Sequence, residues 1–157
     1  MAEIFEQKSF LFVIATMSKP ILTLLAFCFY LYSFAQGGKA VVEIENIRLA
    51  KGGQMAVAGF TAKYFLKTGK QVTEVTRDVS SEKMIFTFEN LPAGEYAFAA
   101  YQDVDRNKSL NTNIIGYPKE PFGFSNNPTL LFGPPSFEDS KVTVTANKTT
   151  TAKIKLR

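Results

Sequence analysis

A short polar segment carries the residues whose types and spacing favour a chemical role. From Asp103 to Asn113, oxygen-bearing side chains fall at every second position. Alternate residues can point inward together, and hard oxygen ligands placed in this way replace the hydration shell of calcium. Glu120, seven residues further on, can supply a further carboxylate. The spacing therefore predicts a calcium site, whose candidate ligands are Asp103, Asp105, Asn107, Ser109, Asn113 and Glu120.

This segment matches only part of an EF-hand loop. Its first three ligand positions fit the pattern D-x-[DN]-x-[DN], but Lys108 replaces the glycine at the sixth position and Ile114 replaces the glutamate at the twelfth. The alternative is that Asp103 and Asn107 only form Asx-turns at the end of a strand. We expect no required cofactor, with Ca²⁺ as the one ion that the residues favour.

Aromatic and amide residues further along the same segment are typical of a ligand-binding rim. In this hypothesis aromatic rings stack on a ligand that polar side chains hold. The alternative is a rigid surface structure, in which prolines fix the path and aromatic rings attach the loop to a sheet. The candidate rim residues are Tyr117, Phe122, Phe124, Asn126, Asn127 and Glu138.

Composition excludes several classes of enzyme. The chain has no histidine and one cysteine, Cys28, which removes Ser-His-Asp and Cys-His catalysis. Two of the carboxylates of Asp103, Asp105, Glu120, Glu138 and Asp139 could act as acid and base in glycoside hydrolysis. Surface loops commonly carry paired acidic residues, so we expect a protein that is not an enzyme.

The rest of the chain must position these residues, and its pattern is that of short strands. Apolar and polar residues alternate with a period of two, which is typical of strands with one buried face. Strands are expected at 41–47, 55–60, 73–79, 84–89, 96–101, 141–146 and 152–157. One turn of helix is expected at 62–66. The pattern predicts an all-β immunoglobulin-like or transthyretin-like sandwich at 36–157, with one long ordered loop at 102–136.

The N-terminal segment predicts export. Residues 21–35 form an apolar run of about 15 residues, whereas a membrane-spanning helix needs about 20. Lys19 precedes the run, and Ser33 and Ala35 are the small residues that a signal peptidase requires. We expect a signal peptide at 1–35 that is cleaved near Ala35, with translation starting at Met17. The alternatives are an uncleaved anchor at 10–35 and a lipoprotein modified at Cys28.

Two sets of motifs connect the chain to known families. The phrase Leu91-Pro92-Ala93-Gly94-Glu95-Tyr96 resembles the Leu-Pro-x-Gly-x-Tyr turn of transthyretin-like and carboxypeptidase-regulatory-like sandwich domains. The segments Asp103-x-Asp105-x-Asn107, 116–120, 123–127 and 132–139 resemble domain-of-unknown-function family 2141, a family of exported bacterial proteins. That family usually has glycine at Lys108 and commonly an acidic residue at Asn111. The resemblance implies a periplasmic or secreted β-sandwich and assigns no reaction.

These observations favour a non-catalytic binding or structural module in the cell envelope, with an unknown envelope or extracellular ligand. One alternative is a carboxylate-dependent hydrolase that acts on envelope or extracellular glycans. Another is a subunit that adds an edge strand to an envelope assembly. The net charge is +4, but the basic residues are scattered singly, so no nucleic-acid partner is expected. After cleavage of the leader, no stable membrane insertion is expected.

Overall fold

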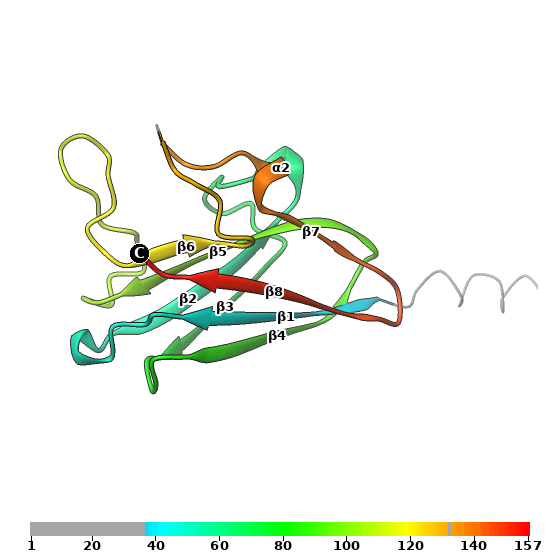
Figure 1. Cartoon of the computed structure of the whole chain (residues 1–157), viewed down its shortest axis with the longest axis horizontal. Helices are drawn as coiled ribbons and strands as arrows, with labels where there is room; N and C mark the ends of the chain where they lie inside the picture. Colours follow the sequence, from blue (N-terminus) through cyan, green and yellow to red (C-terminus); the bar gives the residue numbers. More distant parts are fainter. Residues whose placement is uncertain (1–36, 132) are drawn as a thin grey trace, which may run out of the picture. The chain divides into compact units, whose positions relative to one another are not determined.

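The computed structural model describes residues 37–131 and 133–157, and eight strands in two layers form the framework of this part of the chain (Figure 1). The strands are β1 (Gly38–Glu45), β2 (Gln54–Phe60), β3 (Thr73–Asp78), β4 (Met84–Leu91), β5 (Gly94–Asp103), β6 (Phe122–Phe124), β7 (Lys141–Val144) and β8 (Thr149–Lys155). The helical elements are two short 3-10 turns, η1 (Leu49–Lys51) and η2 (Ala62–Tyr64), and the single-turn helix α2 (Phe137–Ser140).

The strands form one sheet of three and one sheet of five. The first has the order β4-β1-β8, with β1 and β8 parallel. The second has the order β3-β2-β5-β6, and β7 also pairs with β5. Strand β5 is long enough to take two partners on one side: its beginning pairs with β7 and its end pairs with β6. The end of β5 therefore leads directly into the segment with the candidate site.

The hydrophobic core lies between the two sheets. The alternating residues of each strand face inward, as in Val42 of β1, Phe86 of β4 and Ile154 of β8. Phe88 stacks on Phe98 across the layers, with ring centroids 5.4 Å apart. Among the described residues, the core extends from Ala40 to Leu156, and residues 37–157 form one compact unit. This unit has a hydrophobic core of its own, which is what an independently folding domain requires.

A second group of aromatic side chains covers the outer face of the five-stranded sheet. In β6, Gly123 faces inward, because a Cβ there would lie 2.6 Å from Cγ2 of Ile154. Its neighbours Phe122 and Phe124 therefore point outward, where their rings pack edge to face. Phe65 contacts the rings of Phe60, Phe124 and Phe137, and these five phenylalanines form the outer aromatic cluster.

The predicted all-β sandwich is confirmed, and each predicted strand is present with shifted ends. The prediction of a continuous loop at 102–136 is wrong, because β5 extends to Asp103 and β6 lies inside this segment. Strand β6 has no apolar and polar alternation, since all three of its residues are buried. The sequence also gave no indication of η1 or α2, whereas the turn expected at 62–66 is observed as η2.

The Leu-Pro-x-Gly-x-Tyr phrase forms the turn between β4 and β5. Leu91 lies in the core, and the hydroxyl of Tyr96 donates a hydrogen bond to the carbonyl oxygen of Pro92 at 2.8 Å. This bond ties the start of β5 to the turn before it.

The predicted signal peptide, the start at Met17 and the alternatives that involve Cys28 lie outside the described residues. Among the helices of the described part of the chain, none is long and apolar enough to cross a membrane.

Candidate metal centre

Strand register brings together two acidic residues that are far apart in the sequence. In the β5–β6 pair Tyr101 lies opposite Phe122, and the amide of Gln102 donates a hydrogen bond to the carbonyl oxygen of Pro121 at 2.8 Å. Continuing this antiparallel register by one residue places Asp103 opposite Glu120. Their side chains therefore lie on the same face, at the point where the two strands separate.

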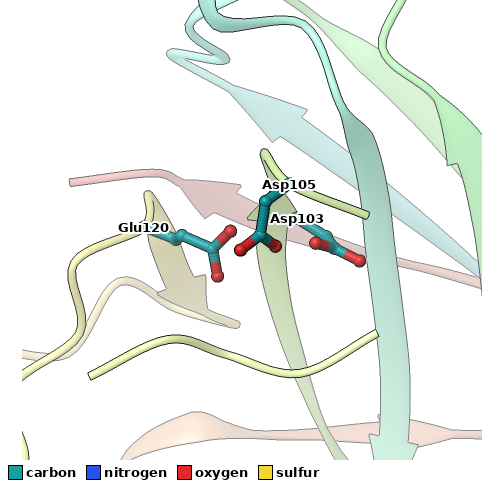
Figure 2. Close-up of side chains that lie close together, drawn as sticks. All are labelled: Asp103, Asp105 and Glu120. Atoms are coloured by element: carbon teal, nitrogen blue, oxygen red, sulfur yellow. The ribbon is translucent and has the colours of Figure 1, made fainter. Parts of the chain in front are cut away.

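Asp105 completes a cluster of three carboxylates, which we call the carboxylate cluster. Asp103, Asp105 and Glu120 each place one oxygen within 4.8 Å of the others. Figure 2 shows the carboxylate of Asp105 between those of Glu120 and Asp103 in that view. Asp103 and Glu120 are only 1% and 7% exposed, whereas Asp105 is open to solvent. The cluster thus has a buried base and an exposed third member.

Backbone amides surround the two buried carboxylates. The two oxygens of Asp103 accept hydrogen bonds from the amides of Asn107 at 3.1 Å and Lys108 at 2.8 Å. Those of Glu120 accept from the amides of Val104 at 2.8 Å and Asn111 at 3.0 Å. These bonds make the segment from 104 to 111 wrap around the carboxylates.

This wrapping requires an unusual backbone. Arg106 and Lys108 both adopt positive φ, 61° and 62°, a left-handed conformation that most residues avoid. Lys108, at the sixth position of the loop, therefore adopts the left-handed conformation that a glycine adopts in calcium-binding loops. The side chain of Arg106 turns away from the cluster and pairs with Asp78 at the end of β3, at 3.0 Å.

The three carboxylates lie close together in the carboxylate cluster. None of the ion pairs that the described residues form includes Asp103, Asp105 or Glu120. Burial raises the pKa of the Tyr101 phenol, and the nearby negative charges of Asp103 and Glu120 raise it further. A hydrogen bond from the side chain of Asn111, 2.8 Å long, lowers the pKa of Asp105. Asp105 therefore stays ionised at neutral pH.

Two residues beside the cluster fix its base, and sequence reasoning missed both. The buried side chain of Gln102 donates hydrogen bonds to the carbonyl oxygens of Arg48 and Gly52 and accepts one from the amide of Arg48. Gly53 packs so closely that a Cβ would lie 2.2 Å from the carbonyl oxygen of Asp103. Gln102 reads as an outward polar residue after a strand, so only the tertiary structure reveals its role.

The predicted metal ligands separate into two groups. Asp103, Asp105 and Glu120 come together, and the side chain of Asn107 adjoins them through a hydrogen bond to Asp105 at 3.0 Å. Asn113 instead accepts hydrogen bonds from the amides of Ile115 and Tyr117, so it stabilises a turn outside the cluster. Ser109 is exposed, and its amide donates to Asn107.

Four of the six predicted rim residues make contacts within the protein. Phe122 and Phe124 are buried in the outer aromatic cluster, so their rings are not free to stack on a ligand. The side chain of Asn127 accepts a hydrogen bond from the amide of Lys155 at 2.6 Å, and that of Asn126 donates to the carbonyl oxygen of Lys141 at 2.9 Å. These two amides tie the loop to β8 and β7.

The other two predicted rim residues lie in different places. Glu138 lies in α2 and pairs with Lys141 at 2.7 Å, whereas Tyr117 lies on the loop before β6 and is exposed over half of its surface. Asp139 accepts a hydrogen bond from Ser136. Glu138 and Asp139 are therefore not part of the carboxylate cluster.

An open depression of about 350 Å³ adjoins the carboxylate cluster. Its lining residues are Lys51, Val104, Asp105, Asn111, Thr112, Lys119 and Glu120. The residues that line the depression include no aromatic ring, and the pKa of the Asp105 carboxyl group is lowered. A general acid for glycoside hydrolysis needs a raised pKa, which Asp105 does not have.

Comparison with known proteins gives one match. Residues 42–153 match a family described as "Uncharacterized protein conserved in bacteria (DUF2141)". No curated protein and no solved structure matches the chain. The matched range runs from β1 to β8 and includes the whole carboxylate cluster. The chain therefore belongs to this family of bacterial proteins.

Proposed function

We propose that the protein is an exported, non-catalytic β-sandwich module of the cell envelope, whose loop between β5 and β6 is a binding or structural element braced by calcium. One observation carries the proposal: two nearly buried carboxylates and a third exposed one converge, and none of the three forms an ion pair within residues 37–131 and 133–157. Buried charges in proteins are generally paired or bound to a metal.

Several features of the carboxylate cluster favour calcium as the ion. The ligands are hard oxygens, and the carbonyls and amide side chains of the surrounding loop can add to them. Each carboxylate oxygen that accepts one backbone amide still has a lone pair for a cation. Magnesium demands a regular octahedron at shorter distances, which a loop fixed by strand register is poorly suited to provide.

The non-catalytic part of the proposal rests on the state of the carboxylates. Asp103 and Glu120 are occupied by backbone amides, and Asp105 has a lowered pKa. A general acid must be protonated at neutral pH, and the lowered pKa of Asp105 opposes that role. Bracing explains the same contacts directly, because each carboxylate connects two points of the loop.

A thermal melt of residues 37–157 in calcium and in chelator tests the ion. Loops of extracellular modules bind calcium with dissociation constants of roughly 0.1 to 1 mM. At about 10 mM calcium, mass action then stabilises the folded state by about 1.4 to 2.7 kcal/mol. We expect a rise in melting temperature of about 4 to 10 °C. Equal melts in both solutions would refute calcium binding.

Matched variants locate the site. Asp105→Asn keeps the size of an exposed side chain and removes one charge of the carboxylate cluster, so it should abolish most of the calcium shift. Glu138→Gln makes the same kind of change outside the cluster and should keep the whole shift. A shift that survives in Asp105→Asn but is lost in Glu138→Gln would place the ion elsewhere. Magnesium at equal concentration controls for ionic strength.

The export part of the proposal rests on the apolar run at 21–35 and the small residues before Gln36. Its test is the N-terminal residue of the protein isolated from the cell envelope, which should be Gln36. Recovery of the intact leader on the envelope protein would show that the segment is an anchor.

A further inference from the structure

The loop between β5 and β6 ends in an exposed apolar tip. Ile114 is fully exposed, Ile115 is 82% exposed and Tyr117 is 56% exposed. In Figure 1 this part of the chain is the yellow-green loop at the upper left, which lies before the start of β6. Single exposed apolar residues are common on protein surfaces, but two adjacent isoleucines at the end of a projecting loop indicate an interaction site. We call residues 113–117 the apolar tip.

The apolar tip has an ordered backbone. Thr112 and Pro118 form an isolated β-bridge below it, and the amide of Asn113 donates a hydrogen bond to the carbonyl oxygen of Tyr117 at 2.8 Å. The side chain of Asn113 accepts from the amides of Ile115 at 3.1 Å and Tyr117 at 2.9 Å. The amide of Gly116 donates to the carbonyl oxygen of Asn113 at 3.0 Å.

This internal hydrogen bonding has a consequence for the partner. Four of the five backbone amides of the apolar tip donate within the loop, so few of its amides lose a hydrogen bond when the tip leaves water. Satisfied backbone groups are the main requirement for a segment that enters the apolar part of a bilayer. A protein partner would supply its own hydrogen-bond donors and acceptors, so binding to it would not require satisfied amides in the tip.

Basic side chains lie at the base of the loop that carries the tip. Lys119 follows the tip by two residues, and Lys51 and Lys119 both line the depression, together with Asp105 and Glu120. Lys51, Lys108 and Lys119 are exposed, and none takes part in an ion pair of the described residues. Such lysines at the level of lipid headgroups attract anionic phospholipids.

We propose that the apolar tip inserts shallowly into the surface of an anionic lipid bilayer, with Ile114 and Ile115 among the upper acyl chains. The ring centroids of Tyr117 and Phe122 are 6.0 Å apart. Tyr117 therefore lies between the two isoleucines and the sheet, at the level of the membrane interface where tyrosines are favoured. Lys119 and Lys51 then contact headgroup phosphates. This peripheral contact deepens the proposed function by naming its partner, and it depends on the loop being the functional element but not on a bound ion.

Flotation of residues 37–157 with lipid vesicles tests the inference. Vesicles of phosphatidylglycerol and phosphatidylcholine in equal parts should bind the protein, and vesicles of phosphatidylcholine alone should bind it more weakly. The double variant Ile114→Ser, Ile115→Ser should bind at least about tenfold more weakly, because two isoleucine side chains no longer transfer out of water. Lys119→Glu should weaken binding only to the anionic vesicles.

A matched double variant controls for general apolarity. Ile85 and Leu131 are 58% and 78% exposed and lie outside the loop, so Ile85→Ser, Leu131→Ser should bind as the unchanged protein does. All variants should melt at the unchanged temperature, because the replaced side chains are exposed. Equal vesicle binding by the two double variants, or no binding by the unchanged protein, would overturn the inference.

Two further readouts separate the possible causes of failure. Sedimentation of the free protein shows whether the apolar tip instead joins two copies of the chain, and association that only the tip variant loses would replace lipid by a second copy. Each vesicle measurement is repeated in calcium and in chelator. If calcium raises the melting temperature but the protein binds no vesicles, the membrane inference is overturned and calcium binding stands. If the protein binds vesicles but calcium leaves the melting temperature unchanged, only calcium binding is refuted.

Discussion

Gln102 should contribute more to stability than any other polar side chain at this end of the sandwich. Its side chain is fully buried and makes three hydrogen bonds, of 3.0, 2.9 and 2.7 Å, to the backbone of Arg48 and Gly52. Gln102→Leu keeps a similar volume but removes all three bonds. At about 1 kcal/mol for each bond, we expect a loss of roughly 3 kcal/mol. Small domains have only about 5 to 15 kcal/mol of stability in total.

Urea unfolding followed by circular dichroism measures this loss. The control is Gln54→Leu, because Gln54 lies directly opposite Asp103 in the β2–β5 pair but makes one exposed hydrogen bond, to Asp78 at 3.1 Å. We expect a change below about 0.5 kcal/mol for the control. A loss below about 1 kcal/mol for Gln102→Leu would refute the reasoning and would mean that backbone packing alone holds η1.

The remaining predictions concern backbone geometry and tyrosine ionisation. Gly53→Ala should destabilise the domain by more than about 2 kcal/mol, because Gly53 has a φ of 80° and a Cβ there would meet backbone atoms of Asp103. The control is Gly52→Ala in the same urea assay. Gly52 has a φ of 60° and open space around it, so this change should cost only about 1 kcal/mol. Tyr96→Phe should cost about 1 kcal/mol through loss of its bond to Pro92. Burial raises the pKa of Tyr96, so its contribution is fully present below about pH 10 and is lost as the pH rises through the raised value. Tyr96→Phe should therefore flatten the decrease in melting temperature above pH 10.

The sandwich could be predicted because most of its strands have one buried face and one face exposed to solvent. Where a strand alternates, as in β4 with its buried Phe86 and Phe88 and exposed Ile85 and Thr87, the pattern identifies the strand directly. Strand β6 lacks this pattern because both of its faces are covered, Gly123 by Ile154 and the two phenylalanines by the outer aromatic cluster. A three-residue apolar run in a loop cannot be distinguished from loop packing by periodicity.

The site was predictable in its carboxylates and not in its supporting contacts. Spacing identified Asp103 and Asp105, and Glu120 was the nearest later carboxylate, which the β5–β6 register then places opposite Asp103. The internal contacts of the predicted rim residues could not be predicted, because aromatic and amide residues that bind a ligand have the same composition as those that attach a loop. Sequence alone does not show that Phe124 contacts Phe65 or that Asn127 bonds to β8.

Hydrogen bonds connect the carboxylate cluster to the base of the apolar tip. Glu120 accepts from the amides of Val104 and Asn111, so it joins both ends of the loop segment that leads to the tip. The amide of Lys119 also donates to the carbonyl oxygen of Asn111 at 2.8 Å, which closes the base of the tip. Neutralising the three carboxylates would strengthen this base, because their mutual repulsion opposes the same contacts that hold the loop closed. A cation in the carboxylate cluster would therefore lower the conformational entropy that the tip loses on insertion. Vesicle binding should then be tighter in calcium than in chelator.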